Sequence, residues 1–240
     1  MRTLVASLIL LAFSRGDALP PLIAGNLTLW AWERPDDLRW LAGSGVGVAL
    51  LERTVAIRAG RVDVERRRQP LRVAPDTRLT AVVRVETDHN ATDLALVPRV
   101  ATEIADAARM PRATAVQIDF DARLSERPFY SALPREVRVR PPLRVSMTAL
   151  ASWCTDDPWI EAGVVDEIVP MLFQMGPDAP RIITRLQEDR RWPVNACVSA
   201  QGLSTDEPWR RLPAASTTYI WRGPDAITAR SVGALARHGG

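Results

Sequence analysis

The sequence predicts a single-domain (β/α)8 barrel of the TIM type, an α/β fold. The chain has 240 residues, of which 47% are apolar and 25% charged, which is the composition of a globular domain. Eight short apolar runs typical of buried strands recur along it, and helix-like segments separate most of them. A barrel of eight parallel strands with intervening helices has roughly 200–400 residues, so the chain is near the lower limit.

The first eighteen residues are typical of an export signal. Arg2 provides the positive start, Leu4–Phe13 the apolar stretch, and Gly16–Ala18 a small-residue cleavage point. The apolar stretch is too short to span a bilayer. The alternative is a buried first element of the fold. We therefore expect residues 1–18 to be a signal peptide, residues 19–240 to form the barrel in the periplasm or outside the cell, and no stable membrane insertion after cleavage.

The expected strands and helices alternate in chain order. The strands are the short apolar runs Leu27–Glu33, Val46–Leu51, Leu79–Glu86, Ala115–Asp121, Leu143–Leu150, Glu167–Met175, Ala196–Ala200 and Thr217–Trp221. The helices, several of which begin with Asp or Ser as N-cap, are Asp36–Leu41, Asp93–Arg109, Ser125–Val137, Pro158–Gly163, Asp178–Arg190 and Asp225–Arg237. A hairpin of Val55–Ile57 with Val62–Val64 replaces the second helix, and we expect no helix in residues 202–215.

The composition excludes several kinds of chemistry. Every one of the 31 basic residues counted as Lys or Arg is Arg, so the chain lacks the lysine of a Walker-A loop, a kinase or a Schiff-base enzyme. His89 and His238 are the only histidines and Cys154 and Cys197 the only cysteines, too few for a histidine-rich or four-cysteine metal site. After removal of the signal, 29 Arg face 27 acidic residues, which favours no nucleic-acid partner. Any catalysis must use carboxylates, and we expect no cofactor.

The fourth expected strand carries the candidate catalytic residues. Alternation along Ala115–Asp121 turns the apolar residues toward the helices and Gln117, Asp119 and Asp121 into the barrel. Burial and mutual repulsion should raise the pKa of one carboxyl group, which provides a general acid beside an ionised partner. Arg84 on the third strand is expected to keep one carboxylate charged. The alternative is a purely structural Asp–Arg network.

Active sites of such barrels lie at the carboxyl ends of the strands. Besides Arg84 and Gln117, the residues expected there as substrate contacts are Glu33, Glu86, Trp153, Gln174, Glu207 and Trp221.

Tryptophans favour a sugar ligand. The chain has 8 Trp against 4 Phe and 2 Tyr, and flat indole faces suit pyranose rings. Trp153, Trp159, Trp209 and Trp221 all lie near strand ends, and we expect at least two solvent-facing indoles to line the cleft. Trp30 or Trp32 is expected to pack inside the barrel. The alternative is that all of them pack the core.

Four segments carry a resemblance that covers nearly all of the mature chain. Val-Gln-Ile-Asp-Phe-Asp-Ala (116–122), Glu126–Tyr130, Ser146–Cys154 and Val169–Gly176 resemble a bacterial family described only as a domain of unknown function. The resemblance extends from Trp30–Pro35 to Ser204–Glu207. It implies membership of the family and no particular activity.

A more distant resemblance concerns activity. Gln117-x-Asp119-x-Asp121 is similar to the Asp-x-Asp-x-Glu motif of chitinase-like glycoside hydrolases, whose last acid protonates the glycosidic oxygen. The resemblance implies that Asp121 is the acid and Asp119 its supporting carboxylate. A register in which Asp121 matches the middle Asp leaves Arg123 in place of the Glu, which implies no such catalysis.

Two later strands also resemble these hydrolases. Asp166–Gln174 is similar to their Met-x-Tyr-Asp strand, with Phe173 and Gln174 in place of Tyr and Asp. Trp221 takes the place of a tryptophan under the sugar. Without the Tyr-Asp pair, the resemblance does not imply a mechanism that uses the substrate's acetamido group.

The expected function is that of an exported, glycoside-hydrolase-like barrel that binds and hydrolyses a carbohydrate with Asp121 and Asp119. The alternative is a non-catalytic glycan-binding or envelope-associated barrel. A hydrolase with a metal on Asp119, Asp121 and Glu86 is disfavoured because no histidine is near.

The sequence has features that favour and features that disfavour a disulfide between Cys154 and Cys197. Export and an even number of cysteines favour a disulfide. However, Cys154 follows the fifth expected strand and Cys197 lies near the start of the seventh, so they belong to opposite ends of the barrel. Two strand spacings of about 4.8 Å also exceed the Cα distance of about 7 Å that a disulfide tolerates. We therefore expect two free, mostly buried thiols.

Overall fold

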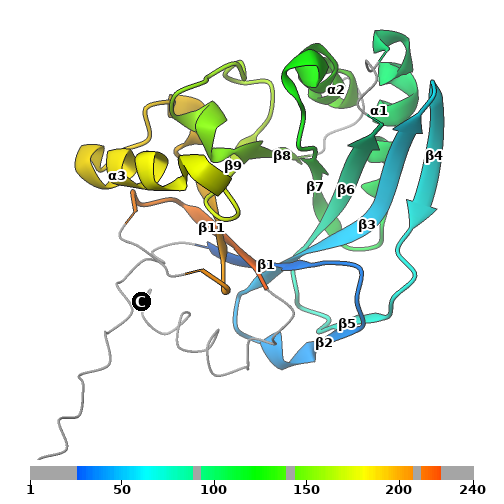
Figure 1. Ribbon diagram of the computed structural model, residues 1–240. Helices are drawn as coiled ribbons and strands as arrows, with labels where there is room; N and C mark the ends of the chain where they lie inside the picture. Colours follow the sequence, from blue (N-terminus) through cyan, green and yellow to red (C-terminus); the bar gives the residue numbers. More distant parts are fainter. Residues whose placement is uncertain (1–25, 89–92, 139–143, 208–211, 223–240) are drawn as a thin grey trace, which may run out of the picture.

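The barrel is closed by eight parallel strands (Figure 1). The computed structural model describes residues 26–88, 93–138, 144–207 and 212–222. In order around the barrel the strands are β1 (Asn26–Ala31), β3 (Gly47–Arg58), β6 (Leu79–Thr87), β7 (Ala113–Asp119), β8 (Arg144–Leu150), β9 (Glu167–Met171), β10 (Ala200–Ser204) and β11 (Thr217–Trp221), which pairs with β1. The predicted fold class is confirmed. The expected signal peptide, Trp209 and the helix Asp225–Arg237 lie outside the described residues.

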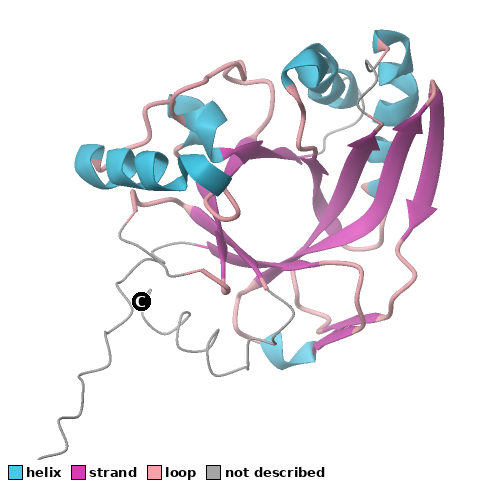
Figure 2. Cartoon of the chain, in the orientation of Figure 1, coloured by secondary structure: helices cyan, strands magenta, loops and turns pink. Residues whose placement is uncertain are grey.

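In the part of the chain that the structure describes, three α-helices lie outside the barrel (Figure 2). They are α1 (Val97–Ala107) after β6, α2 (Arg127–Arg138) after β7 and α3 (Ala179–Asp189) after β9. A short 3₁₀ turn leads into each: η2 (Leu94–Leu96), η3 (Leu124–Glu126) and η5 (Gly176–Asp178). Outward-facing strand residues such as Val116 and Ile118 share one large apolar core with helix residues such as Ile104 and Leu133.

A second, smaller cluster fills the inside of the barrel. Trp30 and Tyr219 form it with four small or β-branched residues, Ala49, Val82, Val169 and Ala200. The Trp30 Nε1–H donates to Gln117 Oε1 at 2.7 Å, and Gln117 Nε2 donates to Ser146 Oγ at 3.1 Å. In the same interior, the Ser146 and Tyr219 hydroxyls both donate to Glu167 Oε1. The prediction that Trp30 or Trp32 packs inside the barrel is confirmed for Trp30.

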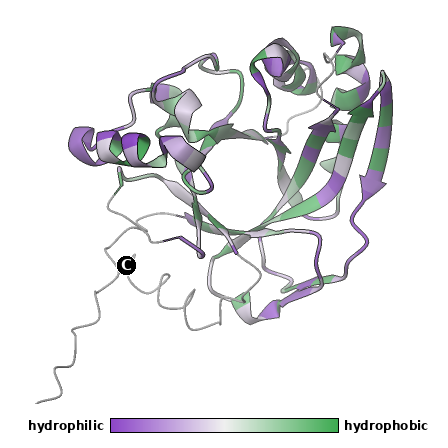
Figure 3. Ribbon diagram, in the orientation of Figure 1, coloured by the Kyte–Doolittle hydropathy of each residue, from purple (hydrophilic) through white to green (hydrophobic). Residues whose placement is uncertain are grey.

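The β-hairpin predicted after the second strand is present and extends the barrel wall. β3 pairs with β1 up to Leu50, and from Arg53 onward the same edge pairs with the antiparallel strand β4 (Arg61–Arg66). Ala59 and Gly60 make the turn with φ of 47° and 73°. Figure 3 shows hydrophobic and hydrophilic residues alternating along this wall. Arg53, only 1% exposed, pairs with Glu52 of its own strand and ties the wall to α1 through an ion pair with Glu103.

Two expected helices are absent. Residues 36–41 form β2 (Asp36–Leu38) and the 3₁₀ turn η1 (Arg39–Leu41), and β2 pairs with β5 (Leu71–Val73) in a separate two-stranded sheet. The helix prediction is wrong there because β5 satisfies the backbone of this short segment. Pro158–Gly163 is an irregular connection in which Trp159 packs against Trp153 and Tyr130. The packing of its aromatic side chain holds this connection without helical hydrogen bonds.

Cys154 and Cys197 form a disulfide with a Cα–Cα distance of 5.9 Å. The prediction of free thiols is wrong because β10 begins at Ala200, four residues later than expected. Cys197 therefore lies in the 3₁₀ turn η6 (Asn195–Cys197), and Cys154 ends the turn η4 (Ala151–Cys154). Both turns contact β9, the strand between β8 and β10. The disulfide thus joins two connections beside that strand.

We expect thiol titration of the unfolded, unreduced protein to find no reactive thiol. Because the bridge restrains 43 residues of the unfolded chain, the C154S/C197S variant should lose about 2–4 kcal/mol of unfolding free energy in urea titrations. Two reactive thiols in the wild type would contradict the bridge.

A methyl group at Gly202 would meet the indole of Trp30. A Cβ built at this position lies 2.8 Å from Trp30 Cη2, closer than packed side chains approach. Gly202→Ala should therefore cost about 1–3 kcal/mol of unfolding free energy, as overpacked cores do. The smaller ring of Trp30→Phe should reduce this penalty in the double variant. Equal penalties in the two backgrounds would show that the indole is not the obstacle.

Candidate functional site

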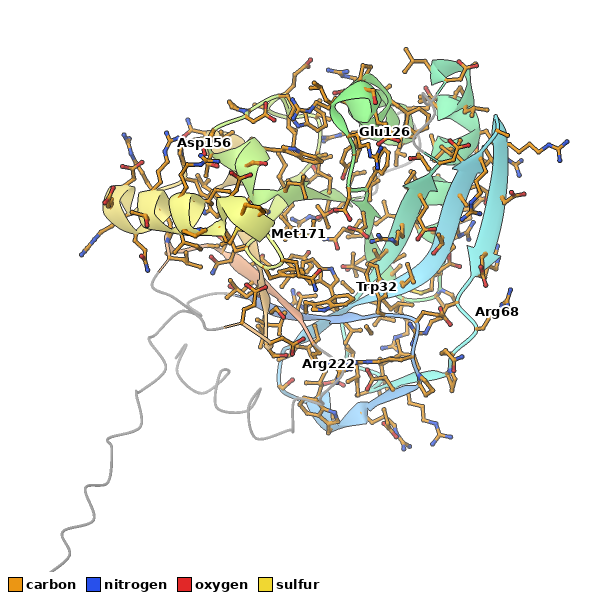
Figure 4. All side chains as sticks on the ribbon, in the orientation of Figure 1. Trp32, Arg68, Glu126, Asp156, Met171 and Arg222 are labelled. Atoms are coloured by element: carbon orange, nitrogen blue, oxygen red, sulfur yellow. A yellow bond between two sulfur atoms is a disulfide. The ribbon has the colours of Figure 1, made fainter. Side chains whose placement is uncertain are left out.

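A pocket of about 590 Å³ opens where the carboxyl ends of the strands meet. Its lining is aromatic and aliphatic on one part and acidic on another: Trp30, Trp32, Arg84, Asp119, Asp121, Thr148, Leu150, Ala151, Ser152, Met171, Phe173, Gln174, Met175, Asp178, Ile182 and Trp221. Trp32 and Met171, labelled in Figure 4, lie toward the centre of the barrel. The pocket is therefore at the end of the barrel where this fold class places active sites.

Arg84 gathers the carboxylates of the pocket. It lies on the inner face of β6, and its guanidinium contacts Asp119 Oδ2 at 2.8 Å, Glu86 Oε1 at 3.2 Å and Asp121 Oδ2 at 3.7 Å. The same guanidinium lies 5.9 Å from the centre of the Trp32 ring, within reach of a cation–π interaction. One cation thus fixes acids from two neighbouring strand ends against an indole. The three acids therefore share Arg84 as their counter-charge.

Asp119 is buried, whereas Asp121 is open to the pocket. Asp119 is 4% exposed, and its two oxygens accept hydrogen bonds from Thr148 and Arg84. Burial raises the pKa of Asp119 above its usual value, the Arg84 charge opposes the rise, and the Asp121 charge adds to it. The Asp121 side chain, two residues beyond, is 50% exposed. The expectation that alternation brings both acids to one site is confirmed, as is the position of Arg84 beside them.

Three aromatic rings form a continuous wall of the pocket. Trp32 meets Trp221 edge to face at 5.0 Å, and Phe173 lies nearly parallel to Trp221 at 6.3 Å, with 10° between the ring planes. Trp30 packs beneath against Phe173 at 6.1 Å. Since these rings lie at or just beyond the carboxyl ends of β1, β9 and β11, only barrel closure brings them together.

Gln174 lines the pocket in an uncommon backbone conformation. Its φ is 52°, in the left-handed region that non-glycine residues enter at a cost. Glu207, from the loop after β10, accepts the Gln174 backbone N–H at 2.7 Å and so stabilises this conformation. Both residues were predicted to be substrate contacts. In the structure Gln174 reaches the pocket, and Glu207 acts through the Gln174 backbone.

Four other predicted contacts do not line the pocket. Gln117 is buried beneath Trp30, and Glu86 lies on the wall beside Arg84 and Arg58. Glu33 instead accepts the backbone N–H groups of Arg68 and Gln69 and holds a loop.

Trp153 is the fourth predicted contact that does not line the pocket. At 2% exposure it belongs to the outer core, so the prediction that it faces the cleft is wrong. It belongs to η4, beyond the end of β8, where strand alternation no longer determines direction.

Two contributors to the site were not predicted from the sequence as site residues. Thr148, which donates to Asp119, follows Ser146 by two residues on the inner face of β8. Alternation applied to the fifth strand would have found it. Trp32 lies just beyond β1 and was expected only as a possible core residue. Of the named tryptophans, Trp221 lines the pocket, while Trp159 packs on Trp153.

No family model, curated protein or solved structure matches the chain. Fold and site together define its class as a TIM-type barrel with an arginine-linked carboxylate cluster and an aromatic wall at the mouth. Within the described ranges, no three His, Cys, Asp or Glu side chains are arranged to hold a metal ion. The same ranges contain no helix long and apolar enough to cross a bilayer.

Removing the Arg84 charge should destabilise the fold in a pH-dependent way. Arg84→Gln leaves Asp119 buried without its cation, which we expect to cost about 3 kcal/mol near pH 7, the lower end for buried pairs because Arg84 is one-third exposed. The pKa of Asp119 is already raised in the folded state, and loss of Arg84 raises it further. The folded state then binds the proton more readily than the unfolded state. Stability is therefore retained at low pH and lost as pH rises through the folded pKa.

Urea titrations of Arg84→Gln between pH 4 and 8 measure this effect. The penalty should shrink toward pH 4, and the additional substitution Asp119→Asn should remove the pH dependence. A penalty that is constant across this range would contradict the assignment to Asp119.

Proposed function

We propose that the protein binds a carbohydrate in this pocket and hydrolyses it with Asp121 and Asp119. The observation that carries the proposal is the combination of a three-ring aromatic wall with a half-exposed carboxylate in one pocket at the barrel mouth. The resemblance of residues 117–121 to the acidic motif of chitinase-like hydrolases supports it.

The lining suits a sugar better than a wholly apolar ligand. Pyranose rings present C–H groups on their faces and hydroxyls at their edges, so they pack on indoles and hydrogen-bond to carboxylates and amides. Trp32, Phe173 and Trp221 provide the rings, and Asp121 and Gln174 the polar contacts. The volume of about 590 Å³ is within the range of small-molecule sites, roughly 300–1,000 Å³.

The two acids have different tasks in this proposal. Glycoside hydrolysis generally uses one carboxyl group as proton donor and a second carboxylate. Asp121, open to the pocket, is the proton donor. Asp119, which accepts from Thr148 and Arg84, is the supporting carboxylate, and the Arg84 charge favours its ionised form against the effect of burial on its pKa.

A second candidate is a glycan-binding or envelope-associated barrel without hydrolysis. One observation favours it: Thr148 and Arg84 already donate to both oxygens of Asp119, so Asp119 is less accessible to a substrate or a water than Asp121 is. Hydrolysis needs a second carboxylate or a positioned water that Asp119 can assist.

The disulfide supports a periplasmic or secreted location. Such bridges persist in oxidising compartments and are rare in the cytosol. Together with the signal-like residues 1–18, Cys154–Cys197 favours export.

Release of reducing sugar from a panel of bacterial and plant polysaccharides tests hydrolysis. Asp121→Asn preserves volume but removes the transferable proton, so we expect at least a hundredfold loss of rate. Glu188→Gln, a single-charge change on the exposed face of α3, is the matched control and should keep full activity. Equal activity of wild type and Asp121→Asn would contradict the role of Asp121. Saccharide binding without release of sugar would support the second candidate.

A further inference from the structure

The charges of the pocket are unbalanced toward acid. Among the described residues that line it, Arg84 is the only cation, whereas Asp119, Asp121 and Asp178 are anions. Arg84 already contacts Asp119, Glu86 and Asp121. Asp178 is balanced by Arg181 at 3.0 Å outside the lining. The pocket therefore presents carboxylate charge and no guanidinium that is free of acidic partners.

This arrangement disfavours an acidic sugar. A uronate or sulfate group entering the pocket must compete with three carboxylates for Arg84, and it also approaches the Asp121 charge. A buried anion without a cationic partner loses its hydration without compensation. A neutral saccharide does not carry this penalty, and for a cationic saccharide the Asp121 carboxylate offers compensation.

We propose that the saccharide bound here carries a protonated amine, as in a deacetylated amino sugar. Of the three carboxylates around Arg84, Asp121 is the farthest from the guanidinium, at 3.7 Å, and its side chain is half exposed. Aromatic rings attract cations, and the Arg84 guanidinium already lies against Trp32 in this lining. An ammonium group of a ligand in this pocket gains the attraction of the Asp121 carboxylate at a site partly shielded from water, with Trp32, Phe173 and Trp221 in the same lining.

The inference rests on the proposed saccharide binding and is independent of hydrolysis. It adds the substrate class: free amines in place of acetamides or hydroxyls. An acetamide is neutral and offers Asp121 only a single N–H donor. A carboxylate that holds an ammonium group stays ionised, so a strong preference for amines at Asp121 also favours the candidate without hydrolysis.

Calorimetric titration with four oligosaccharides of equal length tests the proposal. The probes are glucosamine, N-acetylglucosamine, glucose (β-1,4-linked) and galacturonate oligomers, each at pH 6 and low salt. We expect the glucosamine oligomer to bind at least tenfold more tightly than the neutral oligomers and the galacturonate oligomer to bind least. Raising the pH to 9 deprotonates the amine, and the preference should then disappear.

Asp121→Asn should lose the preference for glucosamine while still binding the neutral oligomers, and Glu188→Gln should retain it. Thermal melting of both variants checks that they fold, and the pH dependence of the wild type needs no variant. Neutral or acidic oligomers that bind as tightly as glucosamine would overturn the amine inference and leave the proposed function standing. Binding of none of the four would count against both.

Discussion

Packing of Trp30 inside the barrel is the contact on which the site depends. Gly202 leaves room for the indole, and Gln117 accepts its N–H, so a large aromatic ring fills the closed barrel without an unsatisfied polar group. Below it, Ser146, Tyr219 and Glu167 form a hydrogen-bonded interior. Above it, the barrel is open. Trp30 is thus the floor of the pocket, and the packed, hydrogen-bonded interior beneath it supports the open upper end of the barrel.

Above this floor, electrostatics determine the arrangement. A carboxylate as deeply buried as Asp119 is expensive without a counter-charge, and Arg84 on the neighbouring strand provides one. The same guanidinium reaches Asp121 and Glu86 and lies against Trp32. The Arg84 charge thus neutralises the protein's own carboxylates and is not free to pair with a ligand. What remains for a ligand is an open carboxylate beside aromatic rings, which is the basis of both functional proposals.

The predictable parts of the structure are those governed by local periodicity. Alternation in residues 115–121 correctly predicted the outward Val116 and Ile118 and the inward Gln117 and Asp119, and β11 has the bounds expected for it. Long amphipathic segments became α1, α2 and α3 close to their expected bounds. Short segments failed: residues 36–41 pair with β5, and residues 158–163 depend on aromatic packing. In such segments few local hydrogen bonds form, and tertiary partners decide.

The sequence by itself determined the barrel class, the strand carrying the acids and the end of the barrel where they lie, because a period of two assigns each strand residue to one face. Only the tertiary structure decided which residues complete the site. Cys154 and Cys197 are joined because turns, and not strands, carry them around β9. Trp32, Phe173 and Trp221 meet because β11 returns to β1 when the barrel closes. Such contacts join residues that are far apart in the chain, and no local sequence pattern predicts which of these residues will meet.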